Sequence, residues 1–381
     1  MNCFNNIAST LATAPMASNS DLNLLERLML SARSSEYAGV HDQVYMLVFW
    51  LSVVFFIVVM GPYAYFIVKY RRKPGVPAQR SVSHNTPLEL TWSILPLLLL
   101  FVLFFVGFEV FISGQIAPAN AETINVRGKK WNWTLAYENG AKTTEFESLV
   151  GVDVPVYAIP AGKPIRLVMD SEDVIHSFYV PDFRKKLDVF PNRYTTMWFE
   201  ASTKDQRHYV FCAEYCGDQH SQMAAILHAM DPADYEQWKL DNVLKLEDMY
   251  PADAGEFLYK SHGCNACHSV DPQSTASTGP PWWNVWNRTE NITGGGTVTV
   301  DENYVRESIY EPAVKVVEGF PNQMNSYQGL ISPEEINLII AYMKTLSDEG
   351  QASYAADKAA WEAAKAAEEA AAEAAGDAAP E

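Results

Sequence analysis

The chain of 381 residues is long enough for two or three domains, and its 48% share of hydrophobic residues allows each a buried core. Its formal net charge of −18 argues against nucleic acid as a partner and suits basic soluble partners instead. Only five cysteines occur, four of them in two short motifs, which argues against a disulfide framework and leaves Cys3 as the odd one.

Two long apolar runs follow a polar N-terminal segment, residues 1–40, which lacks the basic and apolar regions of a standard signal peptide. The runs occupy residues 44–68 and 94–112, and the second carries one charge near its far end. At roughly 1.5 Å per residue, helices of this length can cross the hydrocarbon core of a bilayer. We therefore predict a two-helix transmembrane hairpin over residues 41–115.

The loop between the two runs is basic, with Lys69, Arg71, Arg72, Lys73 and Arg80. Loops rich in lysine and arginine tend to stay on the cytoplasmic side of a membrane. The hairpin loop is therefore predicted to be cytoplasmic, and both ends of the hairpin to face outward.

From about residue 122 the sequence changes to short segments of alternating hydrophobicity, rich in β-branched and aromatic residues and separated by turn signals. This pattern predicts an all-β sandwich or Greek-key domain over residues 120–235. Residues 236–250 are expected to form a linker helix that leads out of it.

A mainly helical domain is predicted over residues 251–347. Its last helix is well marked, because Ser332 suits the N-cap, Pro333 the first helical position and Glu335 the far side of a capping box. Residues 348–381 form a low-complexity Ala/Glu tail, which has high helix propensity but almost nothing that could bury a face.

A soft metal-binding set follows one of the predicted β-segments. Cys212 and Cys216 are followed by His220 and Met223, and thiolate, imidazole and thioether ligands together favour copper. A second histidine must come from elsewhere in the domain, and His176 is the best candidate. Two bridging thiolates with one histidine for each metal would make a compact dinuclear centre that changes shape little on reduction.

Two weaker ligands are available to such a centre, the Met223 thioether and the backbone carbonyl of Glu214. Structural zinc is the alternative metal for cysteine and histidine. Zinc needs only four ligands, however, and would leave Met223 unexplained.

Four segments behind the predicted hairpin, SEDVIHSF, CAEYCGDQHSQM, WNW and LTWSILP, resemble subunit II of haem–copper cytochrome c oxidases over residues 40–245. The resemblance implies a cupredoxin-like domain with a binuclear copper centre, CuA. It implies as ligands His176, Cys212, the Glu214 carbonyl, Cys216, His220 and Met223. It also implies that the Glu214 side chain binds a magnesium ion shared with the catalytic subunit.

The same resemblance gives two further residues a role. Trp131 matches the position of electron entry in the family, although Asn132 stands where the family usually has tyrosine. Tryptophans that only pack the β-domain are the alternative. Glu89 lies at the membrane edge, where a carboxylate is a functional hypothesis by default, and it matches the mouth of a proton channel. A solvated interfacial glutamate is the alternative there.

Cys264-Asn265-Ala266-Cys267-His268 is the attachment motif of a covalent c-type haem. A thioredoxin-like reading of the two cysteines lacks the βαβ surroundings such a motif needs. With Thr278-Gly279-Pro280 and a loop that ends in Met324, residues 251–347 resemble an all-α class I cytochrome c. That resemblance implies His268 and Met324 as axial ligands, a pair that raises the reduction potential.

Together these features predict a multidomain chain: a two-helix transmembrane hairpin, an all-β cupredoxin-like Greek-key domain and an all-α class I cytochrome c domain. They predict the electron-input subunit of a terminal respiratory oxidase. Electrons would pass from an external donor, such as a cytochrome c or a quinol-oxidising complex, through haem c to CuA. Subunit I, which holds the dioxygen-reducing site, would then receive them. We expect the bacterial inner membrane as the location, with both redox domains on its outer side.

Two other functions are compatible with the same motifs. One is a CuA-bearing subunit of a nitric oxide reductase, which only the catalytic subunit would distinguish. The other is a membrane-tethered electron carrier without catalytic partners. Glu89 and the Glu214 carboxylate argue against the carrier, since each has a purpose only against a partner.

Overall fold

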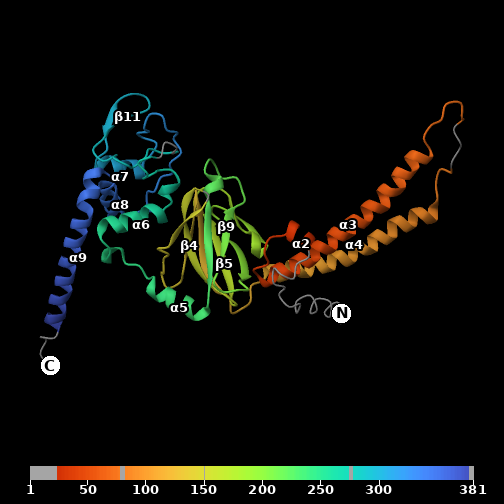
Figure 1. Ribbon diagram of the computed structural model, residues 1–381, viewed down its shortest axis with the longest axis horizontal. Helices are drawn as coiled ribbons and strands as arrows, with labels where there is room; N and C mark the ends of the chain where they lie inside the picture. The colour runs from red at the N-terminus through yellow and green to blue at the C-terminus, as the bar shows by residue number, and fades with distance from the viewer. Residues whose placement is uncertain (1–23, 78–81, 150, 274–277, 377–381) are drawn as a thin grey trace.

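The computed structural model describes residues 24–77, 82–149, 151–273 and 278–376, so that Cys3 and Arg80 lie outside the described residues. A long helical hairpin leads into a β-sandwich, and a helical domain with a projecting C-terminal helix follows (Figure 1). The predicted fold class is confirmed.

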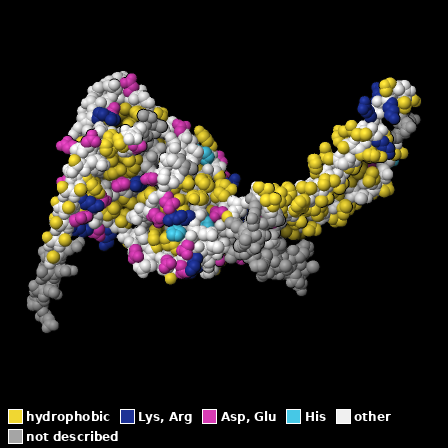
Figure 2. Space-filling model, viewed as in Figure 1, with side chains coloured by type: hydrophobic (Ala, Val, Ile, Leu, Met, Phe, Trp, Pro, Cys, Tyr) yellow, Lys and Arg dark blue, Asp and Glu magenta, His cyan; other side chains and the backbone are white. Residues whose placement is uncertain are grey.

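The hairpin consists of α3 (Glu36–Lys69) and α4 (Thr86–Gln115), preceded by the short α2 (Leu24–Met29). Ser35 and Asn85 cap the two long helices by accepting backbone N–H groups. The most apolar windows of α3 and α4 have hydropathies of 2.6 and 2.7 and are 6% and 0% buried, so their side chains face outward. Figure 2 shows this apolar arm with basic residues at its tip, as expected of a membrane hairpin.

Two sheets form the sandwich, with strand orders β2-β1-β5-β8 and β3-β4-β10-β9-β6-β7. Their interior is filled by large buried side chains such as Trp133, Phe178 and Leu167. The strands are β1 (Glu122–Lys129), β2 (Asn132–Ala136), β3 (Phe146–Leu149), β4 (Val152–Pro160), β5 (Pro164–Ser171), β6 (His176–Val180), β7 (Lys185–Val189), β8 (Thr195–Glu200), β9 (Gln206–Cys212) and β10 (Ala224–Met230), with the 3-10 turn η2 (Pro181–Phe183) between β6 and β7.

The helix that leaves the sandwich, α5 (Pro232–Asp241), begins earlier than the linker expected at residues 236–250. Asp231 caps it and Pro232 occupies its first position. Tyr235 is fully buried against the sandwich, and its hydroxyl donates to Glu122 at 2.8 Å. The helix is therefore packed onto the β-domain, and only the stretch after it, with η4 (Leu246–Asp248), links the domains.

The helical domain contains α6 (Pro251–Ser261), η5 (Cys264–Ala266), α7 (Glu302–Tyr310) and α8 (Pro333–Thr345), with a small ribbon of β11 (Thr289–Asn291) and β12 (Thr297–Thr299). The predicted capping box of α8 is present in full. Helices α6 and α8 touch through backbone at Gly255, where a Cβ atom would lie 2.0 Å from the Leu338 carbonyl oxygen. Glycine is required at this crossing.

The Ala/Glu tail forms one helix, α9 (Asp348–Gly376), that packs on the helical domain at its start and then projects away (Figure 1). Tyr354 and Trp361 lie on one face, each in edge contact with the Tyr250 ring. Lys358 and Tyr354 both bond to Asp253. The Ala/Glu composition gave no sign that one face of this helix could be buried. Tyr354 and Trp361, seven residues apart, form that face.

Buried polar contacts join the hairpin to the sandwich. Asp42 of α3 is fully buried and accepts from Arg33 at 2.8 Å and from Arg184 at 2.9 Å. Lys185 of β7 donates to the Gly114 carbonyl at 2.9 Å, and burial lowers the pKa of Lys185 to about 8. Because buried charges need partners, these contacts fix where the membrane arm meets the β-domain.

Arg184→Met should lower the free energy of unfolding by about 3 kcal/mol, because it leaves the buried Asp42 carboxylate with only Arg33 and the more exposed His41 ring as partners among the described residues. Near-ultraviolet circular dichroism of the detergent-solubilised protein in increasing denaturant measures the change. Arg127→Met is the control, since the Arg127–Asp170 pair is 51% exposed on the arginine side and should contribute less than about 1 kcal/mol. Equal losses in both variants would contradict the prediction.

Candidate functional site

The segment between β9 and β10 carries most of the predicted copper ligands, and strand pairing brings the remaining one to it. Phe178 of β6 pairs with Cys212, the last residue of β9, which places His176 beside Cys212. The Ala213 N–H donates to the Ser177 carbonyl at 2.9 Å, and the Cys212 N–H donates to the Met223 carbonyl at 3.0 Å. The base of the loop is therefore closed from both sides.

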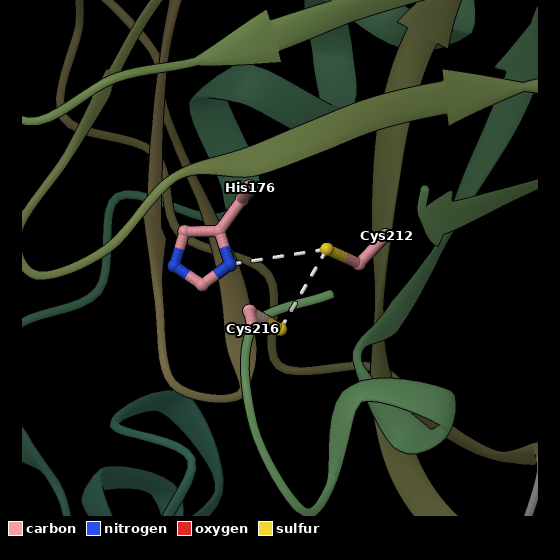
Figure 3. A group of neighbouring side chains, drawn as sticks. All are labelled: His176, Cys212 and Cys216. Atoms are coloured by element: carbon pink, nitrogen blue, oxygen red, sulfur yellow. Dashed lines mark hydrogen bonds between the residues drawn. The ribbon is translucent and has the colours of Figure 1, made fainter. Parts of the chain in front are cut away.

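All six predicted ligand atoms come together in this loop. The sulfurs of Cys212 and Cys216 lie 3.8 Å apart, and Cys212 Sγ lies 3.8 Å from His176 Nδ1 (Figure 3). Cys212 Sγ is 3.2 Å from the Glu214 carbonyl oxygen. On the other side, distances from Cys216 Sγ are 3.5 Å to His220 Nδ1 and 3.8 Å to Met223 Sδ.

The two thiols differ in acidity because they interact. The contact between the two sulfurs lowers the pKa of Cys212 to about 4 despite burial. The same interaction, with burial, raises the pKa of Cys216. Two adjacent buried thiolates therefore form only with a cation between them. This donor set of thiolates, imidazoles and a thioether fits copper.

Asp173 is a functional residue that the motif analysis did not single out. Its Oδ1 lies 2.9 Å from His176 Nε2, so that the histidine can present Nδ1 to the thiolates. Burial alone would raise the pKa of Asp173. Bonds from His176 and from the backbone N–H groups of Lys130 and Val174 outweigh burial and lower the pKa to about 2. The sequence offered one sign of this role, since Asp173 lies three positions before the predicted ligand His176.

A second site lies in the helical domain, where Cys264, Cys267, His268 and Met324 line one cavity that is partly open to solvent. Burial raises the pKa of Cys264 to about 11 and of Cys267 to about 12. These neutral thiols are unlike the low-pKa thiols of redox motifs and fit covalent attachment better.

The proximal side of this cavity fits a planar group held by a histidine. His268 Nδ1 lies 2.7 Å from the Pro280 carbonyl oxygen, which leaves Nε2 to bind a metal. A Cβ atom at Gly279 would lie 2.7 Å from His268 Cε1, so only glycine lets the loop pass the imidazole. Met324 lines the same cavity and also a smaller adjoining one with His268, whereas Met343 is buried in the helix core and lines the smaller cavity without lining the first.

Trp131 stands between the two sites. It is 6% exposed, lines the large cavity and packs against the backbone of Gly217 in the copper loop. Its indole N–H has no partner among the described residues, so a polar edge of a bound group could accept from it. Asn132 donates to the Ser261 carbonyl of the helical domain at 2.8 Å. Asn132, which stands where the family usually has tyrosine, therefore lies at the interface between the two domains.

Neither predicted carboxylate group is buried with the ligand atoms of these centres. Glu89 is partly buried in the first turn of α4, where its Oε1 accepts the Asn85 N–H at 2.9 Å. It therefore has a local capping role in addition to any proton chemistry. The Glu214 residue is exposed at the surface of the copper loop, where a partner could reach its side chain.

Three family models match the chain. The cytochrome c oxidase subunit II periplasmic domain matches residues 122–230, its transmembrane domain matches residues 22–110, and cytochrome c matches residues 252–347. The chain is similar to cytochrome c oxidase subunit 2 of Alkalihalophilus pseudofirmus, with 30% identity over 83% of this chain and 90% of the relative. It is 26% identical to that of Bacillus subtilis, over 75% and 83% of the two chains.

Solved structures give a related result. The periplasmic domain of cytochrome oxidase subunit II of Bradyrhizobium japonicum is 27% identical, with a TM-score of 0.31, over 33% of this chain and 96% of that chain. A chain of a heme-copper terminal oxidase dimer is 16% identical, with a TM-score of 0.23, over 50% and 98%. Because both TM-scores are low, the family relation rests on the sequence matches.

Met324→Ala should abolish the weak iron–sulfur absorption band of a haem bound in the large cavity and lower its potential, because it removes the thioether that favours ferrous iron. Met343→Leu, a volume-conserving change in the core, should cost less than about 1.5 kcal/mol and leave the spectrum unchanged. Absorption spectra and redox titration of the two proteins decide the assignment. A band that survives in the first variant or vanishes in the second would contradict it.

Proposed function

Because the chain belongs to the cytochrome c oxidase subunit II family and carries a C-terminal cytochrome c domain, we propose that it is the electron-input subunit of a terminal respiratory oxidase. Electrons would enter from an external donor at the haem, pass to CuA and leave to subunit I. The position of Trp131, which lines the haem cavity and touches the copper loop, is the observation that carries this route.

In this proposal the copper ligands are His176, Cys212, Cys216 and His220, with weaker ligation by Met223 and the Glu214 carbonyl. Their convergence within one closed loop supports the assignment. Copper held by these residues would supply one-electron transfer. The protein supplies a buried, closed framework that keeps the ligands in place, so little reorganisation accompanies the transfer.

At the haem, Cys264 and Cys267 would form the thioether bonds, and His268 and Met324 would be the axial ligands. Three observations support this arrangement. Both thiols are neutral, His268 bonds to the Pro280 carbonyl, and glycine at position 279 lets the loop lie against the imidazole. His268 is held in one orientation before the haem binds.

The chain is anchored in the membrane by the hairpin and carries its copper and cytochrome c domains outside. We propose that the membrane is the bacterial inner membrane and that both domains lie on its outer side. The exposed Glu214 carboxylate would share a magnesium ion with subunit I. Glu89, at the basic end of the hairpin, would contribute to proton uptake into that subunit.

The full-length protein, matured with copper and haem, should contain two copper ions and one covalent haem. Electron paramagnetic resonance should show a mixed-valence copper signal with two equivalent nuclei, because the two thiolates bridge equivalent metals. Cys216→Ser should remove that signal and leave the haem spectrum intact. A single mononuclear copper, or zinc in its place, would refute the copper assignment.

Glu89→Gln in the assembled oxidase should slow turnover and leave both redox centres spectroscopically unchanged. Glutamine keeps an oxygen that can accept the Asn85 N–H, so the helix cap survives and only the ionisable proton is lost. Steady-state oxygen consumption with spectra of both centres measures the effect. Normal turnover and proton uptake would reduce Glu89 to its capping role.

A further inference from the structure

The loop that carries Met324 is fastened to the copper site by its next residue. Asn325 Nδ2 donates to Asp173 Oδ2 at 3.0 Å, and the other oxygen of Asp173 lies 2.9 Å from His176 Nε2. The carboxylate of Asp173 is 14% exposed, so these bonds lie largely out of water. A haem-domain side chain thus reaches within two hydrogen bonds of a copper ligand.

Asp173 also bonds to the segment that carries Trp131. The Lys130 N–H, one residue before Trp131, donates to the same Oδ2 at 2.9 Å. One carboxylate therefore holds a copper histidine, the backbone beside the interdomain tryptophan, and the loop beside the predicted distal haem ligand. A second contact crosses nearby, from the Gln219 side chain to the Thr278 hydroxyl.

We propose that Asn325 is a positioning residue that acts through Asp173 to set the copper centre and to hold the Met324 loop against it. The inference rests on the proposed function, since it needs both a copper centre and a haem. It assigns to the fused domain a structural influence on CuA in addition to delivery of electrons.

The physical reason is the sharing of one carboxylate among several donors. A carboxylate that loses the Asn325 donor concentrates its charge on the remaining bonds and becomes a stronger acceptor for the His176 N–H. The imidazole then becomes a more basic ligand and favours the oxidised copper centre. Loss of Asn325 should therefore lower the copper potential, and it should free the loop beside Met324.

The same loop offers a matched control. Gln323, two residues before Asn325, also donates a side-chain amide to a carboxylate across the interface, at 2.6 Å to Asp218 Oδ2. No bond from Asp218 to a copper histidine is present among the described residues. Gln323→Leu therefore weakens the interface by one comparable bond without touching the path through Asp173.

The experiment compares Asn325→Leu and Gln323→Leu with the wild-type protein, all matured with copper and haem. Redox titration followed by electron paramagnetic resonance and by the haem spectrum reports each centre separately. In Asn325→Leu we expect a lower copper potential, altered copper hyperfine structure and a weaker iron–sulfur band. In Gln323→Leu we expect the copper potential of the wild type.

An unchanged copper potential in Asn325→Leu, or an equal shift in both variants, would overturn the inference while leaving the proposed function standing. A wild-type protein without a mixed-valence copper signal would overturn both. Should Asn325→Leu fail to mature, Asn325→Ala removes the same donor with a smaller side chain. It should lower the copper potential as far, and no shift there would also refute the proposal.

Discussion

The pairing of β6 with β9 is the contact on which the metal centre depends. It places His176 at the beginning of one strand beside Cys212 at the end of its neighbour, and the loop to Met223 closes over both. The ligands are thus held by the edges of a rigid sandwich. A site of this kind is organised before the metal binds, and rigidity is what an electron-transfer centre needs, because each change in geometry on reduction would add to the barrier.

The four described cysteines have different pKa values because their surroundings differ, and the two pairs suit different chemistry. The contact between Cys212 and Cys216 lowers the pKa of Cys212 and raises that of Cys216, so the pair loses its second proton only to a bound cation. At Cys264 and Cys267, by contrast, burial is the main influence, and it raises the pKa of both thiols. Thiolate ligation of copper and covalent attachment of haem therefore fit different halves of the same chain.

The helical domain is seated on the face of the sandwich that carries Trp131. Asn132, Asp173 and Gln219 of the β-domain all bond across this interface. In this arrangement the chain's own cytochrome c domain covers Trp131, which is 6% exposed and lines the cavity of that domain. The covering domain also brings hydrogen bonds to the surroundings of the proposed copper ligands, through Asn325 to Asp173 and through Thr278 to Gln219.

The sequence by itself determined the order of the domains, the membrane hairpin and the residue types of both sites, because hydrophobic periodicity and ligand spacing are local properties of the chain. The capping box at Ser332 was predictable for the same reason. Only the tertiary structure identified Asp173 as a shared acceptor, Asn325 as its partner and Tyr354 with Trp361 as the face that docks the tail helix. Asp173 and Asn325 are separated by 152 positions, and no local pattern encodes such a contact. Their bond exists because the two domains bury a common surface, on which polar groups must find partners.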